Sequence, residues 1–189
     1  MDQGLPNIVP MTEAAIGVAQ GIVANVRSDQ WATPSACAGW TVRDVVGHLV
    51  VGNETAATAF AGACAVPQGD PLGDAPTAAL ANSSARYLAA LRRPGALTQS
   101  VEMPFGTMPG QTIGMFRFVD FLVHGWDIAK VTGQPTDFAP ELCDAALTIS
   151  HQGMAEYDRA SSNQFGPEQP APESASSADR LAAFLGRTI

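Results

Sequence analysis

The sequence contains almost no lysine and few cysteines. Its 189 residues carry 10 basic side chains against 18 acidic ones, and a single lysine, Lys130, is among the basic ones. Proteins that bind nucleic acids or acidic membrane surfaces gather positive charge against phosphates, so a formal net charge of −8 argues against both partners. The three cysteines form no CxxC pair. A disulfide framework is therefore not expected. We expect a reduced, intracellular protein instead.

Long apolar runs are also missing, and a secretory leader is not expected. The first 11 residues lack the basic start and apolar stretch that a signal peptide requires. The best apolar window near the start, residues 14–26, is interrupted by Gln20 and Asn25. It is also shorter than the roughly 20 residues that cross a bilayer. With 46% apolar residues, the chain is expected to be a soluble, cytoplasmic protein built around one core.

Alanine-rich segments separated by proline and glycine dominate the chain and predict helices. Apolar spacing and helix-start and helix-stop signals place these helices at residues 11–28, 42–65, 77–92, 111–131, 140–159 and 179–186. Thr12 and Thr41 are the expected N-caps of the first two helices. The strand-like residues 100–103 are followed by Pro104 and Gly106, which limit them to a short ribbon or an ordered loop.

This pattern predicts an all-α fold. Four main helices would form a bundle, to which a short extra helix and the irregular ribbon insertion are added. We expect the bundle to span residues 1–160. Residues 161–189 would then be a proline- and serine-rich tail whose short helix packs on the same domain.

The predicted helix at residues 111–131 carries acidic and imidazole side chains in a segment that is otherwise nearly all apolar. Asp120, His124 and Asp127 are spaced i, i+4 and i+7, so they project from one face. A buried carboxylate is costly unless it is paired or binds a metal. A carboxylate and an imidazole one turn apart can bind the same cation. The spacing alone is a weak signal, because any Asp and His on one helix face match it.

A second histidine, His48, lies in the middle of the predicted helix at residues 42–65, among apolar neighbours. Gly52, one turn further on the same face, would leave open space beside the imidazole, although glycine in a helix interior costs about 1 kcal/mol relative to alanine. His48, Asp120 and His124 would form a set of two histidines and one carboxylate with open coordination positions, as a catalytic metal site requires. The alternative is that the histidines are hydrogen-bonded core residues and that Asp120 and His124 form a simple structural pair.

Other residues have less specific interpretations. Asp127 either orients a ligating histidine through its other ring nitrogen or is a surface or capping acid, and we place it in the catalytic set. Cys37 lies in a loop before the second helix, where a helix N-terminus could activate a thiolate. His151 is expected on a polar helix face. The tryptophans are expected to be core residues, with Trp126 beside the proposed site.

Four segments occur in order along the chain: WTVRDVVGH at 40–48, DFLVHGWD at 120–127, FGP at 165–167 and LGR at 185–187. In this combination the sequence resembles the mycothiol-dependent maleylpyruvate isomerase N-terminal domain family, which belongs to the DinB-like superfamily of metal-binding four-helix bundles. The resemblance covers nearly the whole chain. It implies that His48, Asp120 and His124 bind a divalent metal, usually zinc, with nickel or manganese as alternatives.

The resemblance also implies an activity, in which a low-molecular-weight thiol such as mycothiol is used to transfer or isomerise a small electrophile. The isomerase itself has Glu where this chain has Asp120, and it has a second domain that is not expected here, so maleylpyruvate is not the expected substrate. Two further functions stay open. One is a hydrolase in which the metal activates water and Asp127 is the base. The other is a non-enzymatic bundle that binds a metal or a small ligand. A small-molecule partner and a monomer or homodimer are expected.

Overall fold

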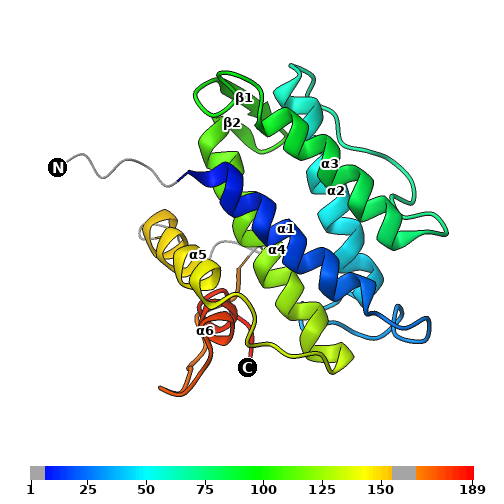
Figure 1. Cartoon of the computed structure of the whole chain (residues 1–189), viewed down its shortest axis with the longest axis vertical. Helices are drawn as coiled ribbons and strands as arrows, with labels where there is room; N and C mark the ends of the chain where they lie inside the picture. Colours follow the sequence, from blue (N-terminus) through cyan, green and yellow to red (C-terminus); the bar gives the residue numbers. More distant parts are fainter. Residues whose placement is uncertain (1–6, 155–164) are drawn as a thin grey trace.

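The computed structural model describes residues 7–154 and 165–189. Within these ranges the chain forms helices and one hairpin (Figure 1): α1 Ile8–Ala24, α2 Val42–Phe60, α3 Pro76–Leu91, β1 Ser100–Met103, β2 Gly106–Pro109, α4 Gly110–Thr132, α5 Pro140–Gly153 and α6 Ser177–Phe184. The strands pair antiparallel, with Ser100 opposite Pro109 and Met103 opposite Gly106. The predicted all-α fold with a short ribbon is confirmed.

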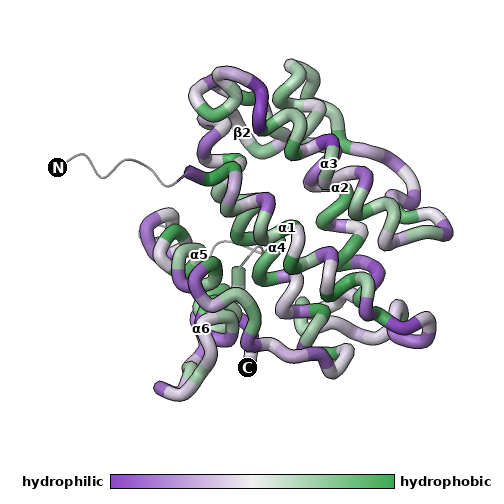
Figure 2. Tube along the Cα trace, viewed as in Figure 1, coloured by the Kyte–Doolittle hydropathy of each residue, from purple (hydrophilic) through white to green (hydrophobic). Residues whose placement is uncertain are grey.

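Helices α1 to α4 form the bundle. α1 packs along α4, and α2 packs on both α3 and α4. The hairpin contacts α2 and the beginning of α4, whereas α5 and α6 pack on each other and on the other side of α4. In Figure 2 the most polar residues lie mainly in the loops and at helix ends, and the apolar residues follow the helices. α4 is therefore the central element, and its side chains reach both the bundle and the C-terminal segment.

The sequence of α4 explains its central position. Apolar residues surround the helix on most sides, and the glycines on its α1 side allow close packing. A Cβ at Gly125 would lie 3.3 Å from Ile22, and one at Gly114 would lie 3.1 Å from Ile8. The helix ends at Gly133, whose φ of 74° is in the left-handed region that glycine adopts without strain. Both bounds of the predicted helix are correct to within two residues.

The start of α2 is fixed by a capping box, as the sequence predicts at Thr41. The Asp44 backbone N–H donates to the Thr41 hydroxyl at 3.2 Å, and the Thr41 backbone N–H donates to the Asp44 carboxylate at 2.8 Å. These bonds satisfy two amides that have no partner inside the helix. The cap thus fixes the start of α2, the helix that carries His48.

Other predicted helix bounds are wrong. α1 runs from Ile8 to Ala24, and Thr12 is a fully buried residue inside it rather than its N-cap. The earlier start buries Ile8 completely in the core. The local capping signal at Thr12 does not include the stabilisation from this burial. α2 ends at Phe60 instead of continuing to residue 65. The predicted continuation of α5 over residues 155–159, and residues 161–164 of the predicted tail, lie outside the described residues.

The C-terminal segment is tied to the helices that precede it. The Trp126 indole N–H donates to Asp179 at 2.7 Å, and Arg180 donates to Asp144 at 2.9 Å. Arg187 forms an ion pair with Asp127 of α4. The division at residue 160 stays a prediction. Among the described helices, none is both long enough and apolar enough to cross a membrane.

Candidate metal centre

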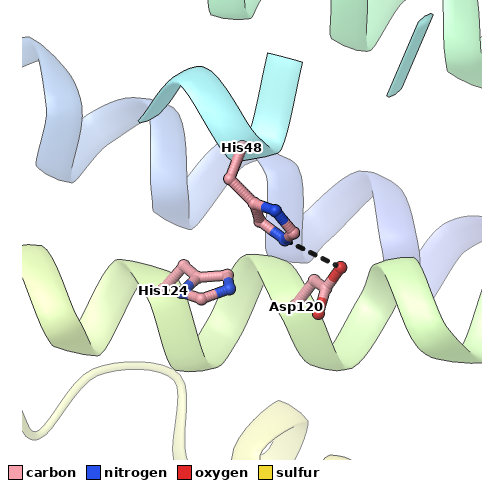
Figure 3. A group of neighbouring side chains, drawn as sticks. All are labelled: His48, Asp120 and His124. Carbon is pink, nitrogen blue, oxygen red and sulfur yellow. Dashed lines mark ion pairs between the residues drawn. The ribbon is translucent and has the colours of Figure 1, made fainter. Parts of the chain in front are cut away.

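Three side chains meet where α2 faces α4 (Figure 3). His48 comes from the middle of α2, and Asp120 and His124 come from successive turns of α4. One ligand atom from each residue can be chosen so that all three atoms lie within 4.8 Å of one another. The distance from His48 Nε2 to Asp120 Oδ2 is 3.7 Å. We call these residues the candidate ligand group. The structure brings together the three residues that the sequence singled out.

The candidate ligand group is partly exposed to solvent. The side chain of His48 is 39% exposed and that of Asp120 is 29% exposed, whereas that of His124 is 8% exposed. A small molecule can therefore approach along His48 and Asp120. His124 forms the inner wall of the site.

His124 is held from behind by a buried ion pair. Its Nδ1 lies 2.9 Å from Oδ2 of Asp127, which leaves Nε2 as the nitrogen available to a ligand. Asp127 is completely buried and accepts two bonds from Arg187, from Nε to Oδ1 at 3.1 Å and from Nη2 to Oδ2 at 2.9 Å. A carboxylate in this position fixes the orientation of an imidazole and raises its basicity, as in many metal sites.

The charges of the site follow from burial and pairing. Burial lowers the pKa of His124 despite its bond to Asp127, so the imidazole is neutral at pH 7 and can act as a ligand. Burial by itself raises the pKa of Asp127, but its bonds to His124 and Arg187 bring the pKa below the ordinary value. Burial by itself also raises the pKa of Asp120, but its contacts with His48 and Arg117 bring the pKa below the ordinary value. Both carboxylates are therefore charged at neutral pH.

A buried arginine that the sequence reasoning missed adjoins the candidate ligand group. Arg117, one turn before Asp120, is 5% exposed, and its Nη1 donates to Asp120 Oδ2 at 2.7 Å. Its guanidinium lies against Gly52, where a Cβ would come within 2.7 Å of Cζ. The expectation of open space beside His48 at Gly52 was wrong, because the guanidinium occupies that space. The available signal was an arginine inside an apolar helix segment, three residues before an aspartate.

Trp40, rather than Trp126, lies beside the candidate ligand group. The centroid of the Trp40 ring system is 5.0 Å from that of His48 and 6.0 Å from that of His124, with which it stacks at 21°. Trp126 is completely buried and bonded to Asp179. The aromatic wall of the site thus comes from the residue just before the α2 cap, which the sequence assigned to the core.

Two other candidate residues, Cys37 and His151, are not part of the candidate ligand group. Cys37 is half-buried, and burial raises the pKa of its thiol. The thiol is therefore protonated at neutral pH, which does not suit a nucleophile. His151 is exposed on α5, and its ring centroid is 4.0 Å from that of Phe184.

The comparisons with known proteins agree with this architecture. The model of the family described as the mycothiol maleylpyruvate isomerase N-terminal domain matches residues 13–129. The chain belongs to this family. The matched range contains the whole candidate ligand group, but Arg187 lies beyond it. Uncharacterized proteins from two strains of Mycobacterium tuberculosis are each 37% identical to this member of the family over 169 residues, which cover 89% of this chain and 91% of the relative.

Two solved structures share the fold. A histidine-to-alanine mutant of the mycothiol-dependent maleylpyruvate isomerase matches with a TM-score of 0.63, and another structure of the mycothiol-dependent maleylpyruvate isomerase matches with 0.54. In each case 77% of this chain covers 68% of the other, at 16% sequence identity. Similarity at this level of identity shows a common fold and nothing more specific.

Proposed function

We propose that this protein is a divalent-metal-dependent enzyme that uses a low-molecular-weight thiol such as mycothiol to transfer or isomerise a small electrophile. The observation that carries the proposal is the candidate ligand group itself. Two imidazoles and a carboxylate converge at a partly open site, and a buried carboxylate holds the inner imidazole. Membership of the mycothiol maleylpyruvate isomerase family supports a thiol as the co-substrate.

The donor set fits a divalent ion. Nitrogen and carboxylate oxygen ligands suit zinc, and they also accept nickel or manganese. We propose His48, Asp120 and His124 as the ligands, because their donor atoms already lie within 4.8 Å of one another. Three protein ligands leave coordination positions open, as is usual in catalytic zinc sites. A bound ion would supply the Lewis acidity that favours the thiolate form of a thiol at neutral pH.

The surrounding residues would orient these ligands and shape the site. Asp127 fixes the ring of His124 and keeps its Nδ1 away from the ligand position. Both oxygens of Asp127 are engaged and the residue has no exposed surface. We therefore propose it as a positioning residue and not as the base of a hydrolase. Trp40 lies against both imidazoles on one side, where it restricts access to solvent.

A non-enzymatic binding module is the second candidate, and one observation favours it. The Asp120 and Asp127 carboxylates each already have an arginine partner, since Arg117 pairs with Asp120 and Arg187 pairs with Asp127. The charges of these two pairs are balanced without an ion. In that case the bundle would hold a small ligand and show no turnover.

Turnover assays that vary the metal and the thiol separately distinguish the two candidates. Zinc-loaded protein is mixed with mycothiol and a panel of activated alkenes and epoxides, and products are identified by mass spectrometry and NMR. We expect product only when metal and thiol are both present. His124→Ala removes a proposed ligand, so it should lower the rate by more than the roughly 10- to 100-fold that loss of a supporting residue costs. A rate unaffected by removal of the metal would contradict the proposal. Ligand binding without turnover under all conditions would support the second candidate.

A further inference from the structure

Arg117 is a buried charge that adjoins the candidate ligand group. Its Nη1 donates to Asp120, while its Nη2 donates to the backbone carbonyl of Leu49 at 2.9 Å and to Asn53 Oδ1 at 3.0 Å. These bonds satisfy the two terminal nitrogens of the buried guanidinium, whereas its Nε has no hydrogen-bond partner in the described part of the chain. The two sets of bonds join α4 to α2 and prevent the guanidinium from turning away from Asp120.

The partner residue Asn53 is itself fixed. Its side-chain amide donates to the hydroxyls of Ser83 at 3.1 Å and Ser84 at 3.2 Å, and all three of these residues are buried. The bonds run from α3 through α2 to Arg117 and end at Asp120. Three bundle helices therefore determine where the Asp120 carboxylate lies.

Gly52 makes this arrangement sterically possible. A Cβ there would lie 2.7 Å from Cζ of Arg117 and 3.2 Å from Nη2, so any other residue would displace the guanidinium. A glycine in a helix interior costs about 1 kcal/mol relative to alanine. At this position the glycine makes room for the Arg117 guanidinium, and does not leave an empty space next to His48.

We propose that Arg117 is a positioning residue that sets the affinity of the candidate ligand group for a divalent ion. Seated against Gly52, it holds the Asp120 carboxylate on the side of His48, where Oδ2 lies 3.7 Å from Nε2. The carboxylate keeps lone pairs for an ion, because Arg117 bonds to only one of its oxygens. This inference rests on the proposed function, since it assumes that the group binds a metal.

Zinc affinity of the folded, metal-free protein tests this role without any measurement of turnover. Gly52→Ala displaces the guanidinium and leaves the three proposed ligand residues unsubstituted. Arg117→Lys keeps the charge, but loses the planar fork that reaches Asp120 and Asn53 together. Gly17→Ala is the matched control, because that helix position has open space around it. Zinc dissociation constants are measured by competition with a chromophoric chelator, and circular dichroism and thermal melts of the metal-free variants confirm folding.

We expect zinc binding to weaken about 10- to 100-fold in Gly52→Ala and Arg117→Lys, in the range typical of residues that support metal ligands. Gly17→Ala should bind like the wild type. A purely structural Arg117 would lower the melting temperature and leave zinc affinity unchanged, and that result overturns the inference. If Gly52→Ala does not fold, Arg117→Lys decides. Failure of the wild type to bind zinc overturns the proposed function as well, so the two failures are distinguishable.

Discussion

Replacing His48 by alanine is expected to abolish stoichiometric zinc binding while the protein remains folded. The wild type should bind about one ion per chain, because three protein ligands with open positions form a single catalytic-type site. The His48 side chain is 39% exposed, and alanine is the best helix former. Loss of the imidazole should therefore change the stability of α2 little. Elemental analysis by inductively coupled plasma mass spectrometry of dialysed, zinc-saturated protein measures the ion content.

His151→Ala is the matched control for this experiment. It removes an exposed histidine on α5 that lies outside the candidate ligand group, so the full ion content should be retained. Equal zinc content in the wild type, His48→Ala and His151→Ala would show that the ion binds elsewhere or not at all. Such a result would remove His48 from the proposed ligand set.

Arg187→Ala is expected to lower the free energy of unfolding by roughly 3–5 kcal/mol, the usual cost of leaving a buried charge without its partner. Arg187 forms two bonds to the fully buried Asp127, and Asp127 in turn holds His124. For a chain of this length such a loss corresponds to a melting temperature lower by roughly 6–20 °C. Urea denaturation and differential scanning calorimetry measure both quantities.

Two comparisons separate this mechanism from a general loss of charge. Arg27→Ala removes a surface arginine paired with Asp29, both more than half exposed, and such pairs contribute at most about 1 kcal/mol. Adding Asp127→Asn to Arg187→Ala removes the unpaired charge and should recover part of the lost stability. If the double variant is as unstable as the sum of the single variants, the buried pair is not the cause.

Much of the fold could be predicted because local signals agree with tertiary packing. Gly133 ends α4 and Thr41 begins α2 at the predicted positions, since a positive φ and a capping box are local features. The predicted N-cap at Thr12 failed because burial of Ile8 extends α1 beyond it. A local capping signal does not include the stabilisation that comes from burying Ile8 in the core.

The candidate ligand group could be predicted in part for a similar reason. His48, Asp120 and His124 attract attention as polar residues in apolar helices, and helical spacing puts two of them on one face. The roles of their supporting arginines could be predicted only in part, from the position of Arg117 three residues before Asp120. Arg117 bonds across to α2, and Arg187 lies 60 residues beyond the carboxylate that it holds. Such contacts depend on how the helices and the C-terminal segment pack, which no local pattern contains.

The central claim is that His48, Asp120 and His124 together hold one divalent ion. Anomalous X-ray scattering at the zinc edge, from crystals grown with zinc, tests it most directly. We predict one strong peak between α2 and α4, with nitrogen and oxygen ligands from these residues at about 2.0–2.2 Å. Crystals that contain zinc but show no peak at this position, with Asp120 paired only to Arg117 and His48, would contradict the claim.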